Sequence, residues 1–211
     1  DATFYAHSVL MTADNNYTFG AGSTTIYPTN GGSDDWMYGE QTTKDKIFAY
    51  TPELGSGGDG FWCDLDRIVP IAQENMIQNI LAAAFSGLYA DVSDVTPSLF
   101  GQTSGYIKYD LTRLGLVDGG TYTVSIEPLS NIANVGDPIA YTNLAILETK
   151  SDSIMITLND GILSGDEFQF NLKVDNGEYV LSETITKVYG EAVTIFEDDG
   201  NTMTNWGSPQ W

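Results

Sequence analysis

The sequence is poor in histidine, cysteine and basic residues, and each shortage excludes a class of protein. A single cysteine, Cys63, among 211 residues rules out an internal disulfide framework and any metal site built from several cysteines. We expect it to be an inert small hydrophobic residue. Only 8 Lys and Arg oppose 29 Asp and Glu, which gives a formal net charge of −21. Because so acidic a protein repels phosphate backbones and anionic lipids, we expect no nucleic-acid partner.

Long hydrophobic runs are also missing. The most apolar stretch, residues 68–85, is interrupted by Pro70 and by several polar residues, so we expect no membrane insertion. No basic segment followed by an apolar run opens the chain, so no signal peptide is visible. With 42% hydrophobic residues, the chain still has enough apolar side chains for a core. Its start at Asp1 and its stop at Trp211 lead us to expect a slice of a longer protein.

The pattern of elements changes near residue 87, which predicts two domains. Residues 1–87 indicate an α/β fragment. A helix over 3–14 would stop at the two asparagines that follow, and a short apolar run over 46–51 predicts a buried strand. The clearest helix covers 66–84, with Asp66 as its cap, an apolar stripe on one face and Gly87 as its end.

Residues 88–196 predict an all-β domain. The alternation of Phe168, Phe170 and Leu172 is typical of a half-buried strand, and turn sequences such as Asp175-Asn176-Gly177 separate the strands. The spacing of the strands favours an immunoglobulin-like or fibronectin-like sandwich. The expected strands are 88–92, 105–111, 121–127, 141–148, 153–158, 167–174 and 179–189.

The last segment, residues 197–211, predicts a linker or the start of a further domain. Asp198-Asp199-Gly200-Asn201 has oxygen ligands that suit calcium, but it matches no complete binding loop, so a solvated linker is favoured. Trp206 and Trp211 could stack on sugars, but packing at a domain junction is favoured.

Five sequence blocks between residues 17 and 75 carry the chemical information. They are YTFG at 17–20, TIYPTNGGSDDW at 25–36, TPEL at 51–54, GFW at 60–62 and IVPIAQEN at 68–75. In their order and spacing these blocks resemble the zinc metallocarboxypeptidases of the carboxypeptidase A/B family. The resemblance covers about residues 1–85, which would be the C-terminal part of the catalytic domain, and it does not extend to residues 88–211.

The resemblance implies roles for two residues. Glu53 corresponds to the catalytic glutamate, the general base that takes a proton from zinc-bound water and later delivers it to the leaving amine. At the end of a buried strand, its carboxylate is expected at the edge of a crevice and partly desolvated. Tyr27 corresponds to the mobile tyrosine that closes over the substrate, the alternative being a packed loop tyrosine.

Asp34 carries the inference about specificity. It lies seven residues after Tyr27, where the family has the residue at the base of the specificity pocket. A buried carboxylate favours a cationic side chain, so an acid there implies a preference for C-terminal Lys or Arg. The alternative is that Asp34 and Asp35 cap or bond the backbone of a polar turn.

The family's zinc ligands are absent from this sequence. The family binds zinc through a His-x-x-Glu pair and a distant histidine, whereas His7 is the only histidine here. A catalytic zinc needs about three protein ligands, so we expect His7 to be an ordinary helix residue. We therefore expect zinc in the intact protein but no metal in this chain, which alone should be inactive.

Two functions follow as hypotheses. The first is a part of a secreted or periplasmic zinc carboxypeptidase that acts on peptide and protein C-termini. Residues 1–87 would then contact the missing N-terminal part of the catalytic domain. The alternative is a non-catalytic β-sandwich that binds a partner or spaces domains, attached to a pseudo-peptidase without zinc ligands.

Overall fold

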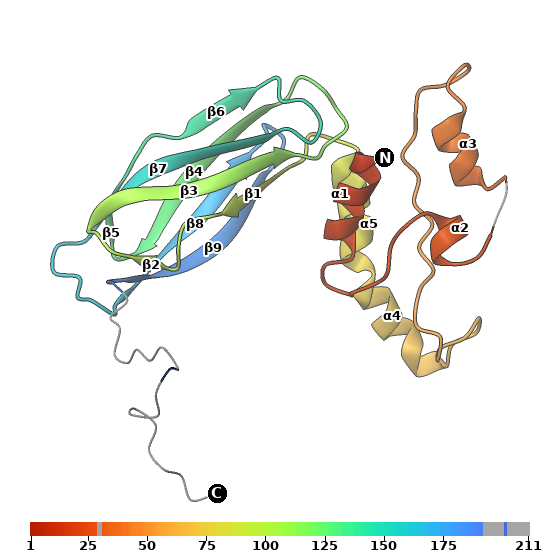
Figure 1. Cartoon of the computed structure of the whole chain (residues 1–211), viewed down its shortest axis with the longest axis horizontal. Coiled ribbons are helices and arrows are strands. Elements are labelled where there is room, and N and C mark those ends of the chain that lie inside the picture. Colours follow the sequence, from red (N-terminus) through yellow and green to blue (C-terminus); the bar gives the residue numbers. More distant parts are fainter. Residues whose placement is uncertain (29–30, 192–200, 202–211) are drawn as a thin grey trace, which may run out of the picture.

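The computed structural model describes residues 1–28, 31–191 and 201, and it shows a helical part beside a strand-rich part (Figure 1). The segment 197–211, expected to be a linker, lies outside the described residues apart from Asn201. The helical elements are α1 (Ala2–Met11), α2 (Gly22–Thr25), α3 (Ser33–Gly39), the 3-10 helix η1 (Leu65–Arg67), α4 (Ile68–Glu74) and α5 (Met76–Phe85). Within the described residues, no helix is long and apolar enough to cross a membrane.

Helix α1 confirms that the first predicted helix exists, but it ends at Met11 and not at residue 14. The Asp1 carboxylate accepts a hydrogen bond from the Thr3 amide at 2.8 Å and caps the N-terminus. Thr3, His7 and Met11 form its buried face, which packs along α5. Asn16 has a φ of 56°, the left-handed conformation expected of asparagine beyond a helix end.

The strand predicted over 46–51 is wrong. This segment is irregular, and one backbone hydrogen bond, from Ile47 N to Met37 O at 3.1 Å, joins it to the rest of the helical part. Its aromatic side chains instead surround the Phe4 ring, with centroid distances of 5.0 Å to Phe48 and 5.2 Å to Tyr50. An apolar run forms a strand only beside a pairing partner, and the described residues of the helical part supply none.

The single helix predicted over 66–84 is divided into η1, α4 and α5. The break lies at Asn75, whose φ and ψ of −105° and 2° are not helical. The Asn75 side-chain amide donates to Ile71 O at 2.8 Å, which replaces the backbone bond of a continuous helix. Asp66 lies inside η1 and caps nothing, because Asp64 is the residue that precedes this element.

The strand-rich part contains two sheets. One sheet has the order β1-β3-β7-β5 and the other β2-β9-β8-β4-β6. All neighbours are antiparallel except β2 and β9, which are parallel. The strands are β1 (Ala90–Asp94), β2 (Leu99–Phe100), β3 (Ser104–Arg113), β4 (Thr121–Ser130), β5 (Ile132–Val135), β6 (Ile139–Thr142), β7 (Thr149–Leu158), β8 (Glu167–Asp175) and β9 (Val180–Tyr189).

Six of the predicted strands correspond to β1, β3, β4, β7, β8 and β9, and one is largely wrong. The predicted strand 141–148 overlaps β6 only at its first two residues, and the chain then turns with positive φ at Asn143 and Leu147. The short strands β2 and β5 are not anticipated, because two and four residues carry too little alternation to show. Both sheets contribute to one buried core that includes Ile107, Tyr109 and Ile154 from the first sheet and Phe168 and Phe170 from the second.

The helical and strand-rich parts are joined by hydrogen bonds as well as by the chain. Leu114 N and Gly115 N both donate to Tyr89 O, at 2.9 and 2.7 Å, and Leu116 N donates to Phe85 O at 2.8 Å. A Cβ on Gly115 would overlap backbone atoms of Tyr89 and Gly87, so only glycine fits there. We call this contact the joint. Its buried apolar residues are Met11, Phe85, Tyr89 and Leu114.

His7 completes the joint. Its ring is fully buried and stacks on Phe85 with a centroid distance of 4.0 Å. Nε2 lies 2.7 Å from Leu114 O, and Nδ1 lies 2.6 Å from the Tyr50 hydroxyl. Because a carbonyl only accepts, Nε2 carries the proton and Nδ1 accepts from Tyr50. Burial lowers the pKa of His7, which keeps the ring neutral.

Candidate functional site

Glu53 lies on an irregular, exposed segment. The expected partial desolvation of its carboxylate is therefore wrong for this chain. The strand that would have buried it does not form, and the neighbouring Leu54 is also 53% exposed. The chain turns directly after it, at Gly55, where φ is 84°.

The turn that follows Glu53 is held from two sides. On one side the Gly55 amide donates to the Tyr17 hydroxyl at 2.7 Å. On the other, the Ser56 amide and hydroxyl donate to Asp59 Oδ2 at 2.8 and 2.7 Å. Arg67 of η1 in turn donates from Nε to Asp59 Oδ1 at 2.6 Å. These donors hold the pKa of Asp59 well below its ordinary value, with the Arg67 hydrogen bond as the largest cause.

Tyr27 and Asp34 lie on either side of residues 29–30. Tyr27 follows α2 and is 59% exposed. Asp34 is exposed in the first turn of α3, where an acid interacts favourably with the helix dipole. Its neighbour Asp35 makes the local cap, because Asp35 Oδ2 accepts from Gly32 N at 3.2 Å. Of the two neighbouring acids, Asp35 is therefore the one that caps the backbone, which was the alternative to a binding role for Asp34. No hydrogen bond or ion pair joins the side chains of Glu53, Tyr27 and Asp34.

The described residues do not supply a metal centre. They contain no group of three or more His, Cys, Asp or Glu side chains placed to hold an ion. Both ring nitrogens of His7 are already hydrogen bonded inside the joint. The donor set of residues 1–28, 31–191 and 201 therefore does not fit a catalytic zinc.

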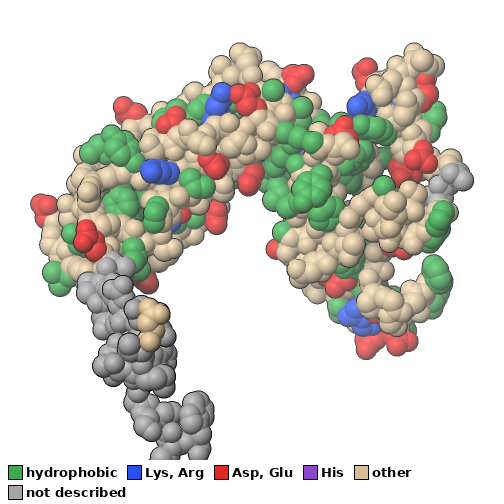
Figure 2. All heavy atoms as spheres, in the orientation of Figure 1, with side chains coloured by type: hydrophobic (Ala, Val, Ile, Leu, Met, Phe, Trp, Pro, Cys, Tyr) green, Lys and Arg blue, Asp and Glu red, His purple; other side chains and the backbone are tan. Residues whose placement is uncertain are grey.

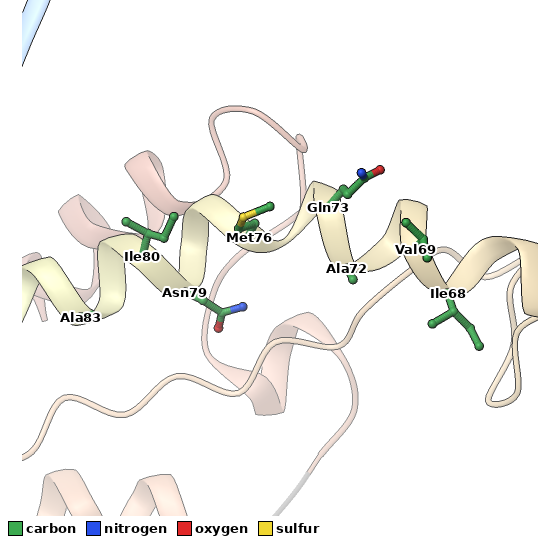
Figure 3. Close-up of a pocket in the computed structure, with 8 residues that line it drawn as sticks. All are labelled: Ile68, Val69, Ala72, Gln73, Met76, Asn79, Ile80 and Ala83. Atoms are coloured by element: carbon green, nitrogen blue, oxygen red, sulfur yellow. The ribbon is translucent and has the colours of Figure 1, made fainter.

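Helices α4 and α5 expose most of the apolar stripe that the sequence shows on one face of the helix predicted over 66–84. Ile71 is buried, but Ile68, Met76 and Ile80 are 49%, 52% and 55% exposed. They line a shallow depression of about 600 Å³ along the two helices (Figure 3). Hydrophobic side chains are conspicuous over the helical part in Figure 2. Phe61 and Trp62, on the loop before η1, are almost wholly exposed. A surface of this kind fits contact with further protein.

The sequence analysis does not anticipate one hydrogen-bonded cluster, which is centred on Tyr17. The Tyr17 hydroxyl donates to Glu74 Oε1 at 2.7 Å and accepts from Asn75 Nδ2 at 3.2 Å, besides accepting from Gly55. Tyr17, Glu74 and Asn75 all belong to the quoted sequence blocks. The sequence offers one signal for it, the run of polar residues at 73–75 within the helix predicted over 66–84, since buried polar side chains need partners.

The comparisons with known proteins that indicate a family concern the helical part. The family model described as zinc carboxypeptidase matches residues 2–78. Carboxypeptidase B of Bos taurus is 44% identical over 62 residues, which cover 29% of this chain and 14% of the relative. Carboxypeptidase B of Astacus astacus is 42% identical over 59 residues, which cover 28% and 18%. Residues 2–78 are thus a fragment of the carboxypeptidase A/B family. The chain spans a small part of the relatives' length.

Two solved structures resemble about half of this chain at low sequence identity. The periplasmic chaperone SfaE has a TM-score of 0.35 and 10% identity, covering 52% of this chain and 60% of its own. A FixG-related protein from Vibrio parahaemolyticus has a TM-score of 0.35 and 9% identity, covering 47% and 95%.

Proposed function

We propose that this chain is part of a zinc metallocarboxypeptidase that hydrolyses C-terminal peptide bonds of peptides and proteins. The observation that carries the proposal is the family match over residues 2–78, which contains Glu53, Tyr27 and Asp34. The intact protein would be secreted or located in the periplasm or at the cell surface. The chain alone is inactive in this proposal.

Glu53 acts as the general base in this proposal. Its carboxylate takes a proton from the attacking water and passes it to the nitrogen of the leaving amino acid. A zinc ion, which residues outside this chain would hold, would supply Lewis-acid polarisation of the scissile carbonyl. The exposed position of Glu53 supports the assignment, because a substrate and a second part of the enzyme can reach it.

Tyr27 and Asp34 bind the substrate. Tyr27 presents a phenol from an exposed loop and donates a hydrogen bond near the terminal carboxylate and scissile amide. Asp34 pairs with the cationic side chain of a C-terminal Lys or Arg. Because Asp35 performs the local capping, the Asp34 carboxylate is left for this role.

The missing N-terminal part of the catalytic domain covers the depression on α4 and α5. The apolar side chains exposed there and the 14% coverage of the bovine relative support this contact. Within the domain expected over residues 88–196, the described residues 88–191 form an immunoglobulin-like or fibronectin-like sandwich that stabilises the helical part. The hydrogen bonds of the joint favour stabilisation over a flexible tether.

The test uses the full-length protein with peptide substrates that end in Lys, Phe or Glu. Glu53→Gln is expected to lower kcat by about 10²- to 10⁴-fold, while the exposed control Glu183→Gln leaves it unchanged. Asp34→Asn should remove the preference for Lys, and its neighbour Asp35→Asn should keep it. Unchanged turnover in Glu53→Gln would refute the base assignment, and faster cleavage of Phe-ended substrate by the unmodified enzyme would refute the role of Asp34.

A further inference from the structure

The hydroxyl of Tyr17 connects three segments of the helical part. It accepts from the Gly55 amide at 2.7 Å, donates to Glu74 Oε1 at 2.7 Å and accepts from Asn75 Nδ2 at 3.2 Å. A phenol oxygen has one proton and two lone pairs, so these three bonds use its full capacity. A single atom thus ties the turn after Glu53 to the α4–α5 break.

Asn75 and the backbone of Glu74, which lie next to the Tyr17 hydroxyl, have further hydrogen-bond partners. Asn75 is 1% exposed; its amide donates to Ile71 O and its Oδ1 accepts from Gln78 Nε2 at 2.7 Å. Asn15 donates to Glu74 O at 3.2 Å and accepts from Tyr17 N at 3.0 Å. Because Asn75 and Asn15 each have further partners, the network has little freedom to move the phenol oxygen.

The turn itself tolerates little rearrangement. Gly55 adopts a φ of 84°, and a Cβ there would lie 3.3 Å from the Ile71 side chain and 3.2 Å from an Asp59 carboxylate oxygen. Its amide is two residues from Glu53, so a shift at Gly55 is transmitted to the Glu53 backbone. Asp59, which is paired with Arg67, anchors the turn at Ser56. The Tyr17 hydroxyl anchors it at Gly55, the end nearer Glu53.

We propose that Tyr17 is a positioning residue, which places Glu53 through the Gly55 amide. The inference rests on the proposed function, in which Glu53 is the general base. Loss of the phenol oxygen leaves the near end of the turn without its anchor, so the carboxylate samples positions from which it cannot reach the attacking water. Small misplacements of a catalytic group lower the rate of the chemical step much more than the binding of the substrate.

The kinetic test is Tyr17→Phe in the full-length protein. We expect kcat to fall about 10- to 100-fold with KM within twofold. Tyr5→Phe is the matched control, because Tyr5 is a 65% exposed tyrosine whose hydroxyl has no hydrogen bond to any residue that the structure describes, and it should behave as the unmodified enzyme. If Glu53→Gln abolishes turnover and Tyr17→Phe leaves kcat unchanged, the positioning role is overturned while the proposed function stands. If Glu53→Gln is silent, the proposed function fails.

A second measurement tests the anchor in this chain without any activity. Hydrogen exchange of the Gly55 amide, followed by NMR, should accelerate at least tenfold in Tyr17→Phe, with the Ser56 amide much less affected because Asp59 still accepts from it. Unchanged exchange at Gly55 would overturn the inference whatever the enzyme kinetics show. Thermal unfolding of both variants separates this local effect from a general loss of stability.

Discussion

His7 predicts an acid-sensitive stability for this chain. It is the only histidine, so no other side chain has an ordinary pKa between about 5 and 8. The folded protein keeps the ring neutral: burial lowers its pKa, and Leu114 O and the Tyr50 hydroxyl satisfy the neutral form. Burial also raises the pKa of Tyr50 to about 12, so Tyr50 does not titrate in this range.

The sign and the size of the effect follow from linkage. A histidine whose folded pKa lies below its unfolded value makes the protein lose stability as the pH falls below about 6.5, and the loss levels off below the folded pKa. One pH unit is worth about 1.36 kcal/mol, so between pH 7.5 and 5.5 the loss in free energy of unfolding is at most about 1.4 kcal/mol.

Urea unfolding at pH 7.5, 6.5 and 5.5 measures this loss. His7→Phe keeps a ring against Phe85 but removes two hydrogen bonds and leaves a buried carbonyl unpaired, so it should cost about 2–4 kcal/mol at pH 7.5. His7→Gln is a second variant that does not titrate and keeps a donor. Both should lack the pH dependence of the unmodified chain. An equal slope in all three proteins would refute the reasoning.

Two further predictions concern packing in and near the strand-rich part. Gly115→Ala should destabilise the protein strongly, because the added Cβ overlaps the backbone of Tyr89, and a calorimetric scan should then show separate unfolding of the two parts. The control Gly57→Ala has open space around it and should be nearly neutral. Equal effects of the two changes would contradict the close packing at Gly115. Lys187→Ala should cost about 3–5 kcal/mol in chemical unfolding, because it leaves the nearly buried carboxylate of Asp94 without its ion-pair partner. Replacing both residues with apolar ones should recover most of that loss, and a cost below about 1 kcal/mol for the single change would contradict the burial of the pair.

The sequence predicts elements well where local pattern and packing agree. The alternation of Phe168, Phe170 and Leu172 predicts β8, because its apolar residues do face the core. The expected strand 46–51 fails because an apolar run specifies burial and not the partner that provides it. The helix over 66–84 breaks at Asn75, where the side-chain amide bonds Ile71 O in place of the backbone bond of a continuous helix.

The candidate site could likewise be predicted only in part from the sequence. The sequence blocks single out Glu53, Tyr27 and Asp34 as candidates, but they do not predict that these side chains are exposed. The sequence does not show which of Asp34 and Asp35 caps α3, because the cap depends on the geometry of a single helical turn. The Tyr17 network could not be assembled from spacing, because its members are 57 and 58 residues apart in the chain.

The joint has a consequence for how such proteins can be divided. A gene cut at residue 87 would produce helices whose Phe85 carbonyl loses its donor and whose His7 loses its carbonyl partner. Exchange of the strand-rich part between related proteins would therefore succeed only if residues 114–116 and the end of α5 were inherited together. The smallest unit that can be transferred between proteins therefore includes residues on both sides of the domain boundary predicted near residue 87.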